Sequence, residues 1–235
     1  MLPLAILAGG FATRLGSLTR DIPKCLIEIK GRPFVEWQLD LLIKNGYSDF
    51  VFCISYKSQM IQDYLEDGSS KGIRIQYSTD GDKQLGTGGA ISNAMPLLGD
   101  KFGVLYGDSY LPINYGEVED FFTNSNFLGA MTVYKNDGLF DSSNVEYSEG
   151  LLKDYNKENK NPLMRHIDYG LSYFNSKAFE TYPRGEFFDL SNLFSDLVRQ
   201  KKIGGHEVNE RFYEIGSVQG IEDFSSYLER HRDEF

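Results

Sequence analysis

The chain has few cysteines and no long apolar run. Only two cysteines, Cys25 and Cys53, occur in 235 residues. Neither has a partner at metal-ligand spacing, so both are predicted to be reduced thiols of the core. No segment approaches the ~20 apolar residues of a membrane span, and the short apolar start lacks the basic region of a signal peptide. We therefore expect a cytoplasmic protein that does not associate with membranes.

Positive charge is also scarce. The chain carries 24 Lys and Arg residues against 34 Asp and Glu residues, a net charge of −10. This balance argues against a broad nucleic-acid surface or an anionic membrane face as partner. A cleft that concentrates a few cations can still bind a nucleotide. The length, and the lack of repeats, low-complexity segments or linkers, predict one domain over residues 1–235.

Two standard phosphate-binding motifs are missing. The sequence contains neither G-x-x-x-x-G-K-[ST] nor G-x-G-x-x-G, the P-loop and dinucleotide fingerprints. Instead, the apolar run Leu4–Ala8 is followed by Gly9 and Gly10. The run suits a buried parallel strand, and a glycine-rich turn after a first strand can cradle a phosphate with backbone N–H groups. Arg14 and Lys24 would add two positive charges, although a Gly-Gly pair alone is equally typical of a plain turn.

Strand and helix patterns alternate along the first half of the chain. Residues Phe34–Asn45 form an amphipathic helix pattern that stops at Gly46, and a second helix pattern covers Gln59–Leu65. Apolar or alternating runs at Phe50–Ile54 and Ile73–Tyr77 predict strands. The order strand, helix, strand, helix, strand predicts a doubly wound α/β sheet.

Further elements follow at regular intervals. A short strand is predicted at Cys25–Ile29, and a helix with free N–H groups at its start is predicted where Gly86 to Ala90 lead into Ile91–Leu98. The remaining predicted elements are strands at 102–106, 128–134 and 166–174, a hairpin of 145–147 with 151–155, and helices at 118–122, 189–201 and 221–235.

An aspartate stands directly after one predicted strand, in the pair Gly107-Asp108. Ligands of open α/β sheets bind at the carboxyl ends of the strands. Mg²⁺ prefers hard oxygen ligands and usually takes one or two carboxylates together with substrate phosphates. Asp108 is therefore a candidate metal ligand. An isolated Gly-Asp is more often a turn, so the assignment depends on the N-terminal segment as well.

Together these segments resemble a known enzyme family. The run L-A-G-G-F-A-T-R-L from Leu7 and the I-P-K that ends at Lys24 are similar to the signature of the sugar-1-phosphate nucleotidyltransferases. The usual form is G-G-x-G-T-R, and Ala12 replaces its third glycine here. The resemblance is nearest to the heptose-1-phosphate guanylyltransferases and the muramate-1-phosphate uridylyltransferases, and it covers nearly the whole chain.

The resemblance implies a fold and its division of labour. It implies a doubly wound mixed α/β sheet, Rossmann-like and GT-A-like, with a small sugar-binding β subregion. Residues 1–110 would mainly bind the nucleotide, and residues 111–235 mainly the sugar phosphate. It also implies Mg²⁺ as cofactor, with an NTP and a sugar 1-phosphate as partners.

The resemblance also implies a role for each candidate residue. Arg14 and Lys24 would be catalytic, while Asp108 and Glu214 would hold the metal. The nucleotide would contact Leu7, Ala8, Gly9, Gly10, Thr13, Gln84, Gly86, Thr87 and Gly107. The sugar phosphate would contact Lys157, Asp168, Tyr169 and Gly170.

The chain departs from the family pattern at several of these positions. Glu214 stands where the family has a second metal-binding aspartate, and Asn156 and Glu158 replace the acidic residue and the proline that flank the family's lysine. Lys157 is therefore open to the alternative of a solvated surface lysine. Asp168 and Tyr169 equally suit an edge strand, and Gly86-Thr87 suits a plain helix entry.

The predicted reaction is NTP plus sugar 1-phosphate giving NDP-sugar and pyrophosphate. One alternative is a non-catalytic nucleotide-sugar sensor on the same fold, which the glutamate at position 214 leaves open. Another is a nucleotidyltransferase that accepts a non-sugar phosphate monoester, because such enzymes share the L-A-G-G…R…P-K opening. The sequence leaves open the base, the sugar and the oligomeric state, a homo-oligomer included.

Overall fold

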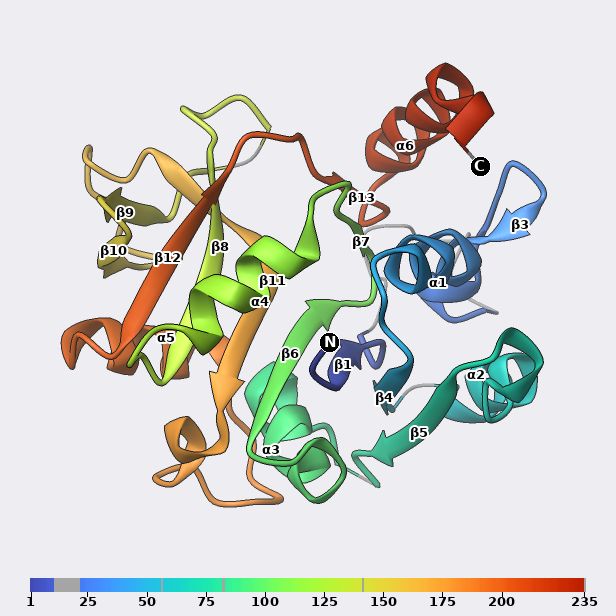
Figure 1. Ribbon diagram of the computed structural model, residues 1–235, viewed down its shortest axis with the longest axis horizontal. Helices are drawn as coiled ribbons and strands as arrows, with labels where there is room; N and C mark the ends of the chain where they lie inside the picture. Colours follow the sequence, from blue (N-terminus) through green and yellow to red (C-terminus); the bar gives the residue numbers. More distant parts are fainter. Residues whose placement is uncertain (11–21, 56, 82, 141, 235) are drawn as a thin grey trace.

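A mixed β-sheet forms the centre of the fold in the computed structural model, which describes residues 1–10, 22–55, 57–81, 83–140 and 142–234 (Figure 1). Within these residues the sheet has nine strands in the order β5-β4-β1-β6-β11-β8-β12-β10-β9. The predicted loop residues Thr13 and Arg14 lie outside the described part of the chain. The mixed α/β architecture that was predicted is confirmed.

One half of the sheet is parallel. It consists of β1 (Leu4–Leu7), β4 (Asp49–Ile54), β5 (Arg74–Thr79) and β6 (Lys101–Tyr106). The chain adds β4 and β5 on one side of β1 and then places β6 on the other side. This reversal makes β1 a topological switch point, where ligands of open α/β sheets bind beyond the carboxyl ends of the strands.

The other half of the sheet is mixed. β11 (His166–Asn175) runs antiparallel to β6 and to β8 (Gly129–Lys135), and β12 (Ile203–Val208) runs parallel to β8. The predicted hairpin forms as β9 (Val145–Ser148) and β10 (Leu151–Tyr155) at the sheet edge. The strand β12 was not predicted.

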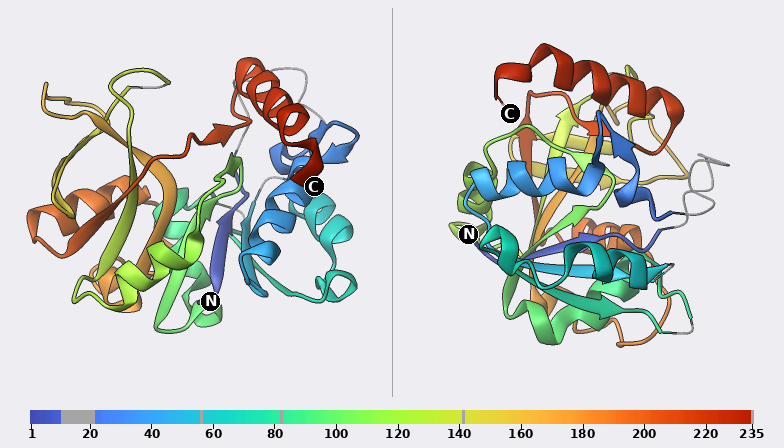
Figure 2. Two further views of the ribbon diagram at one scale, coloured as in Figure 1. Left: turned by 45° about the horizontal axis from the view of Figure 1, so that its top comes forward. Right: turned by 90° about the vertical axis from the view of Figure 1, so that its right-hand side faces the viewer.

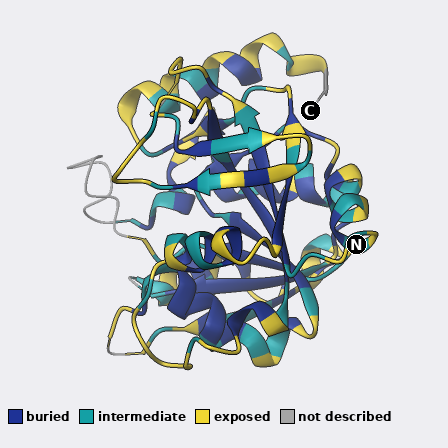
Figure 3. Ribbon diagram, turned by 90° about the vertical axis from the view of Figure 1, so that its left-hand side faces the viewer, coloured by how far each residue is buried: buried dark blue, intermediate teal, exposed yellow. Residues whose placement is uncertain are grey.

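Helices cover both faces of the sheet, as the doubly wound pattern predicts. One apolar cluster packs α1 (Phe34–Lys44), α2 (Ser58–Leu65) and α4 (Tyr115–Thr123) on the first face. A second cluster packs α3 (Gly86–Leu98) and α5 (Leu190–Arg199) on the opposite face. Figure 3 shows the strands between these layers as buried, with exposed residues gathered on the outer sides of the helices and in the loops.

A third apolar cluster holds the C-terminal segment against the first helix. It joins α6 (Val218–Arg230) to α1 and to two short ribbons, β2 (Glu28–Ile29) with β3 (Arg32–Pro33) and β7 (Ser109–Tyr110) with β13 (Tyr213–Glu214). The rings of Phe34 and Phe224 meet edge to face at 5.4 Å. Figure 2 shows α6 beside α1 at one end of the molecule. This packing positions β13, which carries Glu214.

Part of one predicted strand is wrong. Residues Lys24–Leu26 form the 3₁₀ helix η2, and only Glu28–Ile29 of the predicted strand Cys25–Ile29 is extended. The N–H of Leu26 donates to the carbonyl of Pro23 at 3.0 Å, so the chain turns after the proline. The described residues contain three further short 3₁₀ helices, η3 (Ser69–Lys71), η4 (Ser176–Phe179) and η5 (Arg232–Glu234). Among the described residues no helix has the length and apolar character to cross a bilayer.

Candidate active site

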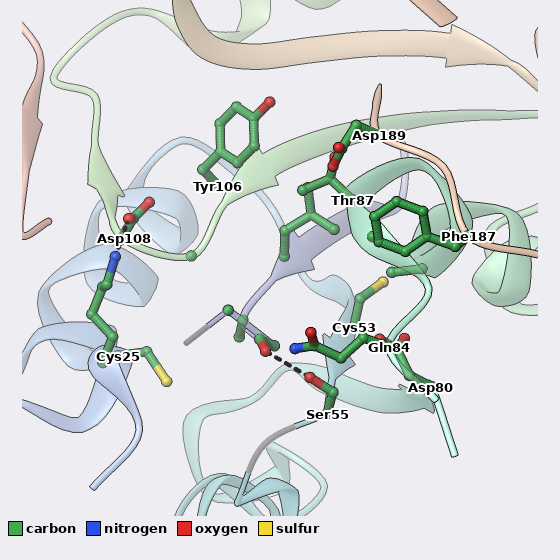
Figure 4. A pocket seen from close by; sticks show the side chains of 18 residues that line it. Cys25, Cys53, Ser55, Asp80, Gln84, Thr87, Tyr106, Asp108, Phe187 and Asp189 are labelled. Atoms are coloured by element: carbon green, nitrogen blue, oxygen red, sulfur yellow. Dashed lines mark hydrogen bonds and ion pairs between the residues drawn. The ribbon is translucent and has the colours of Figure 1, made fainter. Parts of the chain in front are cut away.

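A cavity of about 350 Å³ opens at the carboxyl ends of β1, β4 and β6. Figure 4 shows this cavity, with side chains from both halves of the chain around it. We call it the nucleotide cavity after the role that the sequence predicts for its residues. Ten of the predicted site residues line it: Leu7, Ala8, Gly9, Gly10, Lys24, Gln84, Gly86, Thr87, Gly107 and Asp108. The structure thus brings together residues that are as far apart in the sequence as Leu7 and Asp189.

The glycines that line the cavity are needed for different physical reasons. A Cβ at Gly107 would lie 2.7 Å from the carbonyl oxygen of Leu7, and the Gly107 N–H donates to that carbonyl at 3.0 Å. At Gly9 a Cβ would lie 2.8 Å from Ser55 Oγ, which donates to the Gly9 carbonyl at 2.6 Å. At Gly10 no atom of the described residues lies within 4 Å of such a Cβ. Close chain packing therefore requires Gly9 and Gly107, whereas Gly10 borders open space.

Both cysteines lie against the nucleotide cavity but are almost completely buried. Burial raises the pKa of Cys25 and of Cys53 to about 12. A thiol with such a pKa is protonated at neutral pH and is a poor nucleophile. Both cysteines therefore behave as the reduced core thiols that the sequence predicts.

Lys24 and Asp108, which both line this cavity, form an ion pair. Lys24 Nζ lies 2.8 Å from Asp108 Oδ2, and the two side chains are 21% and 29% exposed. Glu214 reaches the same place because β13 pairs with β7 directly after Asp108, and the Ile215 N–H donates to the Asp108 carbonyl at 3.0 Å. A Cβ at Gly216 would lie 3.9 Å from Lys24 Nζ and 4.0 Å from Glu214 Oε1, so these two charged atoms flank the same glycine.

The donor set at this place fits a divalent cation that also binds substrate. Asp108 and Glu214 offer hard carboxylate oxygens from adjacent, hydrogen-bonded segments. Within the described residues, no group of three or more His, Cys, Asp or Glu side chains forms a closed metal site. Mg²⁺ commonly takes only one or two carboxylates and completes its shell with phosphate oxygens and water.

A second cavity, of about 470 Å³, adjoins the first. We call it the acceptor cavity after the sugar-phosphate contacts that the sequence predicts here. It shares Tyr106 and Asp108 with the nucleotide cavity. Its lining includes Glu214 and the four residues predicted to contact the sugar phosphate, namely Lys157, Asp168, Tyr169 and Gly170. Lys157 is exposed, whereas Tyr169 is only 2% exposed and packs against Tyr134 and Phe212.

A bulge in β11 shapes the acceptor cavity. The register of β11 with β8 shifts between Asp168 and Ser172, and Gly170 within it has φ +107°, which an L-residue with a side chain rarely adopts. The Gly170 N–H donates to Asp168 Oδ1 at 3.1 Å. Burial raises the pKa of Asp168, while the charge of Lys157 and the bond from Gly170 oppose this rise.

The start of α3 differs from its predicted form. Its first N–H groups were expected to be free, but those of Gly88 and Gly89 donate to the carbonyl of Phe188 at 3.0 and 3.1 Å. The hydroxyl of Thr87 accepts the N–H of Leu190 at 2.8 Å. A Cβ at Gly88 would lie 2.2 Å from the ring of Phe188. These glycines therefore serve to seat the segment before α5, and Gly86 and Thr87 border the cavity beside it.

Several lining residues were missed from the sequence. Tyr106, at the end of β6, borders both cavities, and its position just before Gly107-Asp108 was a usable signal. Ser55 and Asp80 follow β4 and β5, where the doubly wound pattern also points to ligands. Phe187 and Asp189 enter from the segment before α5, and no local pattern indicates that this segment reaches the nucleotide cavity.

Comparison with known proteins places this site in a family. Residues 4–138 match the model of the nucleotidyl transferase family. This match covers more than half of the chain and includes the cation and the carboxylate that meet at the junction of the two cavities, Lys24 and Asp108. The chain belongs to the nucleotidyl transferase family, and it is an enzyme of this class.

Two curated relatives align over nearly their full length. The D-glycero-alpha-D-manno-heptose 1-phosphate guanylyltransferase of Campylobacter jejuni is 27% identical over 223 residues, which cover 95% of this chain and 97% of the relative. The N-acetylmuramate alpha-1-phosphate uridylyltransferase of Neisseria meningitidis is 26% identical over 215 residues, covering 91% and 92%. The predicted resemblance to these two branches is confirmed.

Solved structures share the fold. HddC from Yersinia pseudotuberculosis superposes with a TM-score of 0.80 at 24% identity, covering 97% of this chain and all of the other. The inositol-1-phosphate CTP transferase from T. maritima superposes with a TM-score of 0.80 at 21% identity, covering 97% and 96%. The arrangement of sheet and helices is therefore that of the nucleotidyltransferases.

Proposed function

We propose that the chain transfers a nucleotidyl group from an NTP to a sugar 1-phosphate, giving an NDP-sugar and pyrophosphate. One observation supports this most directly: the nucleotide cavity and the acceptor cavity meet at Asp108, and Lys24 Nζ lies 2.8 Å from its carboxylate. Two phosphate-bearing substrates that bind from opposite sides would therefore meet beside one cation and two carboxylates. The names of the full-length relatives, both sugar-1-phosphate nucleotidyltransferases, support the same reaction.

The chemistry needs alignment and charge more than proton transfer. A phosphate monoester oxygen of the sugar 1-phosphate attacks the α-phosphorus of the NTP, the bond to the β-phosphate oxygen breaks, and pyrophosphate leaves. The attacking phosphate is mostly ionised near pH 7, because its second pKa is about 6, so no general base is needed. Lys24, freed from Asp108 by the incoming phosphates, would stabilise the charge that develops on the α-phosphate.

Asp108 and Glu214 would hold Mg²⁺ beside the α-phosphate. A cation there supplies Lewis-acid stabilisation of the phosphate charge when it is bound. Its presence would also explain how two carboxylates can face a polyanionic substrate without repelling it. Glu214 is one methylene longer than the aspartate that the family uses, and the pairing of β13 with β7 places its backbone next to Asp108.

The two halves of the chain would divide the substrates between them. Residues 1–110 supply most of the nucleotide cavity, in which Gly9 and Gly10 would offer backbone donors and Gln84 would contact the base. Residues 111–235 supply most of the acceptor cavity, in which Lys157 would anchor the sugar phosphate and Asp168 would accept hydrogen bonds from sugar hydroxyls. Arg14 remains assigned to the leaving phosphates on the sequence alone.

A substrate matrix tests the proposal. GTP, UTP, CTP and dTTP are each combined with a panel of sugar 1-phosphates, including heptose and N-acetylmuramate 1-phosphates, and pyrophosphate release is measured. We expect release with at least one pair and dependence on Mg²⁺. Binding of NDP-sugars by calorimetry without turnover of any pair would instead identify a sensor, and turnover only with non-sugar monoesters such as inositol phosphate or phosphocholine would change the acceptor class.

A further inference from the structure

A large apolar side chain is exposed at the nucleotide cavity. Phe187 is 67% exposed and lines this cavity. Figure 4 shows its ring with Thr87 and Gln84 along one side of the cavity. A single exposed aromatic residue on a protein surface needs no explanation, but one that forms part of a concave site is available to a ligand.

The segment that carries Phe187 is firmly seated. Its neighbour Phe188 donates its N–H to the Leu85 carbonyl at 3.0 Å and accepts from Gly88 and Gly89 at 3.0 and 3.1 Å. The ring of Phe188 stacks on Tyr182 at 4.4 Å between centroids. The ring of Phe188 therefore packs against the start of α3, while the ring of Phe187 lines the nucleotide cavity.

Two residues on this side of the cavity, Gly86 and Gln84, indicate which class of ligand the ring of Phe187 would bind. A Cβ at Gly86 would lie 3.2 Å from Phe187 Cε2, so the ring lies against a backbone that carries no side chain there. Gln84, two residues earlier, lines the same cavity and brings a carboxamide that can both donate and accept hydrogen bonds. A flat apolar face combined with one amide suits a planar ring with polar edges, which is the chemistry of a nucleobase.

We propose that Phe187 is a stacking platform for the base of the NTP, on the side of the cavity where Gln84 is already assigned to that base. This inference rests on the proposed function, since it assigns the base end of the nucleotide to this side of the cavity. Stacking accepts every base because each has a π face. Phe187 would therefore set how tightly all four nucleotides bind, while Gln84 sets their order of preference.

Direct nucleotide binding tests the proposal without requiring turnover. The dissociation constants of GTP, UTP, CTP and dTTP for the full chain are measured by calorimetry with Mg²⁺. We expect Phe187→Ala to weaken every nucleotide that binds by about tenfold, in line with the loss of one base–aromatic stack, without changing their order. Phe187→Trp should restore binding, and Gln84→Ala should change the order.

Two controls separate stacking from damage to the site. Tyr64→Ala removes another exposed aromatic ring, on α2 and outside the residues that line the nucleotide cavity, and should leave all dissociation constants unchanged. Inorganic tripolyphosphate, which has no base, should bind Phe187→Ala and the wild-type chain equally. Thermal unfolding of the variant should match the wild type, because Phe188 and not Phe187 seats the segment.

The outcomes distinguish this inference from the proposed function. Dissociation constants within twofold of the wild type for Phe187→Ala would overturn the platform even if pyrophosphate release continues. Equal weakening of nucleotides and tripolyphosphate would also overturn it, since the effect would then not involve the base. If the wild-type chain binds no nucleotide, the platform is wrong; if it binds nucleotides but turns over no pair, the proposed reaction is wrong and the platform is still tested.

Discussion

Lys24 and Asp108 are 84 residues apart in sequence and form an ion pair in which Nζ and Oδ2 are separated by 2.8 Å. The pair forms where the two cavities meet, and it is partly open to solvent. Exposed pairs contribute little to stability, typically under about 1 kcal/mol. We therefore infer that the pair serves the proposed reaction, in which each side chain would keep the other oriented until phosphate and cation bind.

Removing the charge of Lys24 should affect turnover far more than stability. We expect Lys24→Ala to lower kcat by roughly a hundredfold or more, because loss of one group that stabilises transition-state charge typically costs ~3 kcal/mol. Asp108→Ala should lower kcat to a similar extent. Pyrophosphate release measures both, and thermal unfolding should show that both variants keep the fold.

Lys153→Ala provides the matched control for Lys24. Lys153 is an exposed lysine on β10 outside both cavities, so its loss changes the net charge by the same amount. We expect wild-type rates from it. Near-wild-type turnover of Lys24→Ala with any substrate pair would refute the catalytic role.

Glu214 should set the Mg²⁺ requirement of the reaction. Loss of even an outer-shell partner of a metal ligand typically costs 10–100-fold in metal affinity. Because Glu214 is proposed to be a ligand itself, we expect Glu214→Gln to raise the Mg²⁺ concentration for half-maximal rate by at least about tenfold. Glu214→Asp keeps a carboxylate, so it should raise this Mg²⁺ concentration by less. Glu210→Gln, an exposed glutamate four residues away, should leave the Mg²⁺ titration unchanged, and the same unchanged curve for Glu214→Gln would count against metal binding at this position.

Two glycines of the nucleotide cavity should respond differently to one added methyl group. A Cβ at Gly107 meets the Leu7 carbonyl oxygen at 2.7 Å, so Gly107→Ala must displace one of two adjoining sheet strands. We expect a cost of about 2 kcal/mol, as for other overpacked sites, and a Tm lower by roughly 5 °C. Calorimetry or circular dichroism would measure this loss.

Gly10→Ala is the contrasting variant. In the described part of the chain nothing lies within 4 Å of a Cβ at Gly10, so its Tm should stay within about 1 °C of the wild type while the KM for the NTP rises. Such a result would show that Gly107 is required for the stability of the fold and Gly10 for binding of the ligand. Equal Tm losses for both variants would show that the two positions are alike.

The parallel half of the sheet and the helices over it could be predicted because their signals are local. The strands β1, β4 and β6 are short apolar runs, and α1 shows an apolar periodicity over Phe34–Lys44 that ends before a glycine. In this half, the position of Asp108 directly after a predicted strand also identified it as a candidate site residue. Local pattern and fold agree here because each strand is buried on both faces.

The strand β12 shows why other elements were missed. Its sequence contains Gly204 and Gly205, which weaken any strand pattern. A Cβ at Gly204 would meet the ring of Phe127 at 2.6 Å, and one at Gly205 the ring of Tyr147 at 2.8 Å. The glycines are therefore required by aromatic side chains that are distant in sequence, and such contacts leave no local trace. The position of Phe187 and Asp189 in the nucleotide cavity was missed for the same reason, because it depends on contacts between residues that are distant in sequence.

Asp168 should affect both the binding of the sugar 1-phosphate and the pH dependence of the free energy of unfolding. Burial raises its pKa above the ordinary value of 3.8, so the folded chain binds this proton more tightly than the unfolded chain. Stability from this group is then fully present below pH 3.8 and is lost as pH rises through the raised pKa. At pH 7 the buried charge is a cost, which Lys157 and the Gly170 N–H only partly offset.

Asp168→Asn should therefore be at least as stable as the wild type at pH 7, and this difference should shrink as the pH falls toward 3.8. The same variant should raise the KM for the sugar 1-phosphate by roughly tenfold, since hydrogen bonds to a charged group contribute about 1.5–3 kcal/mol, and leave the KM for the NTP unchanged. Urea unfolding across pH and initial-rate kinetics measure the two effects. A variant that is less stable at pH 7 with an unchanged KM for the sugar 1-phosphate would show that Asp168 serves the fold and not the acceptor.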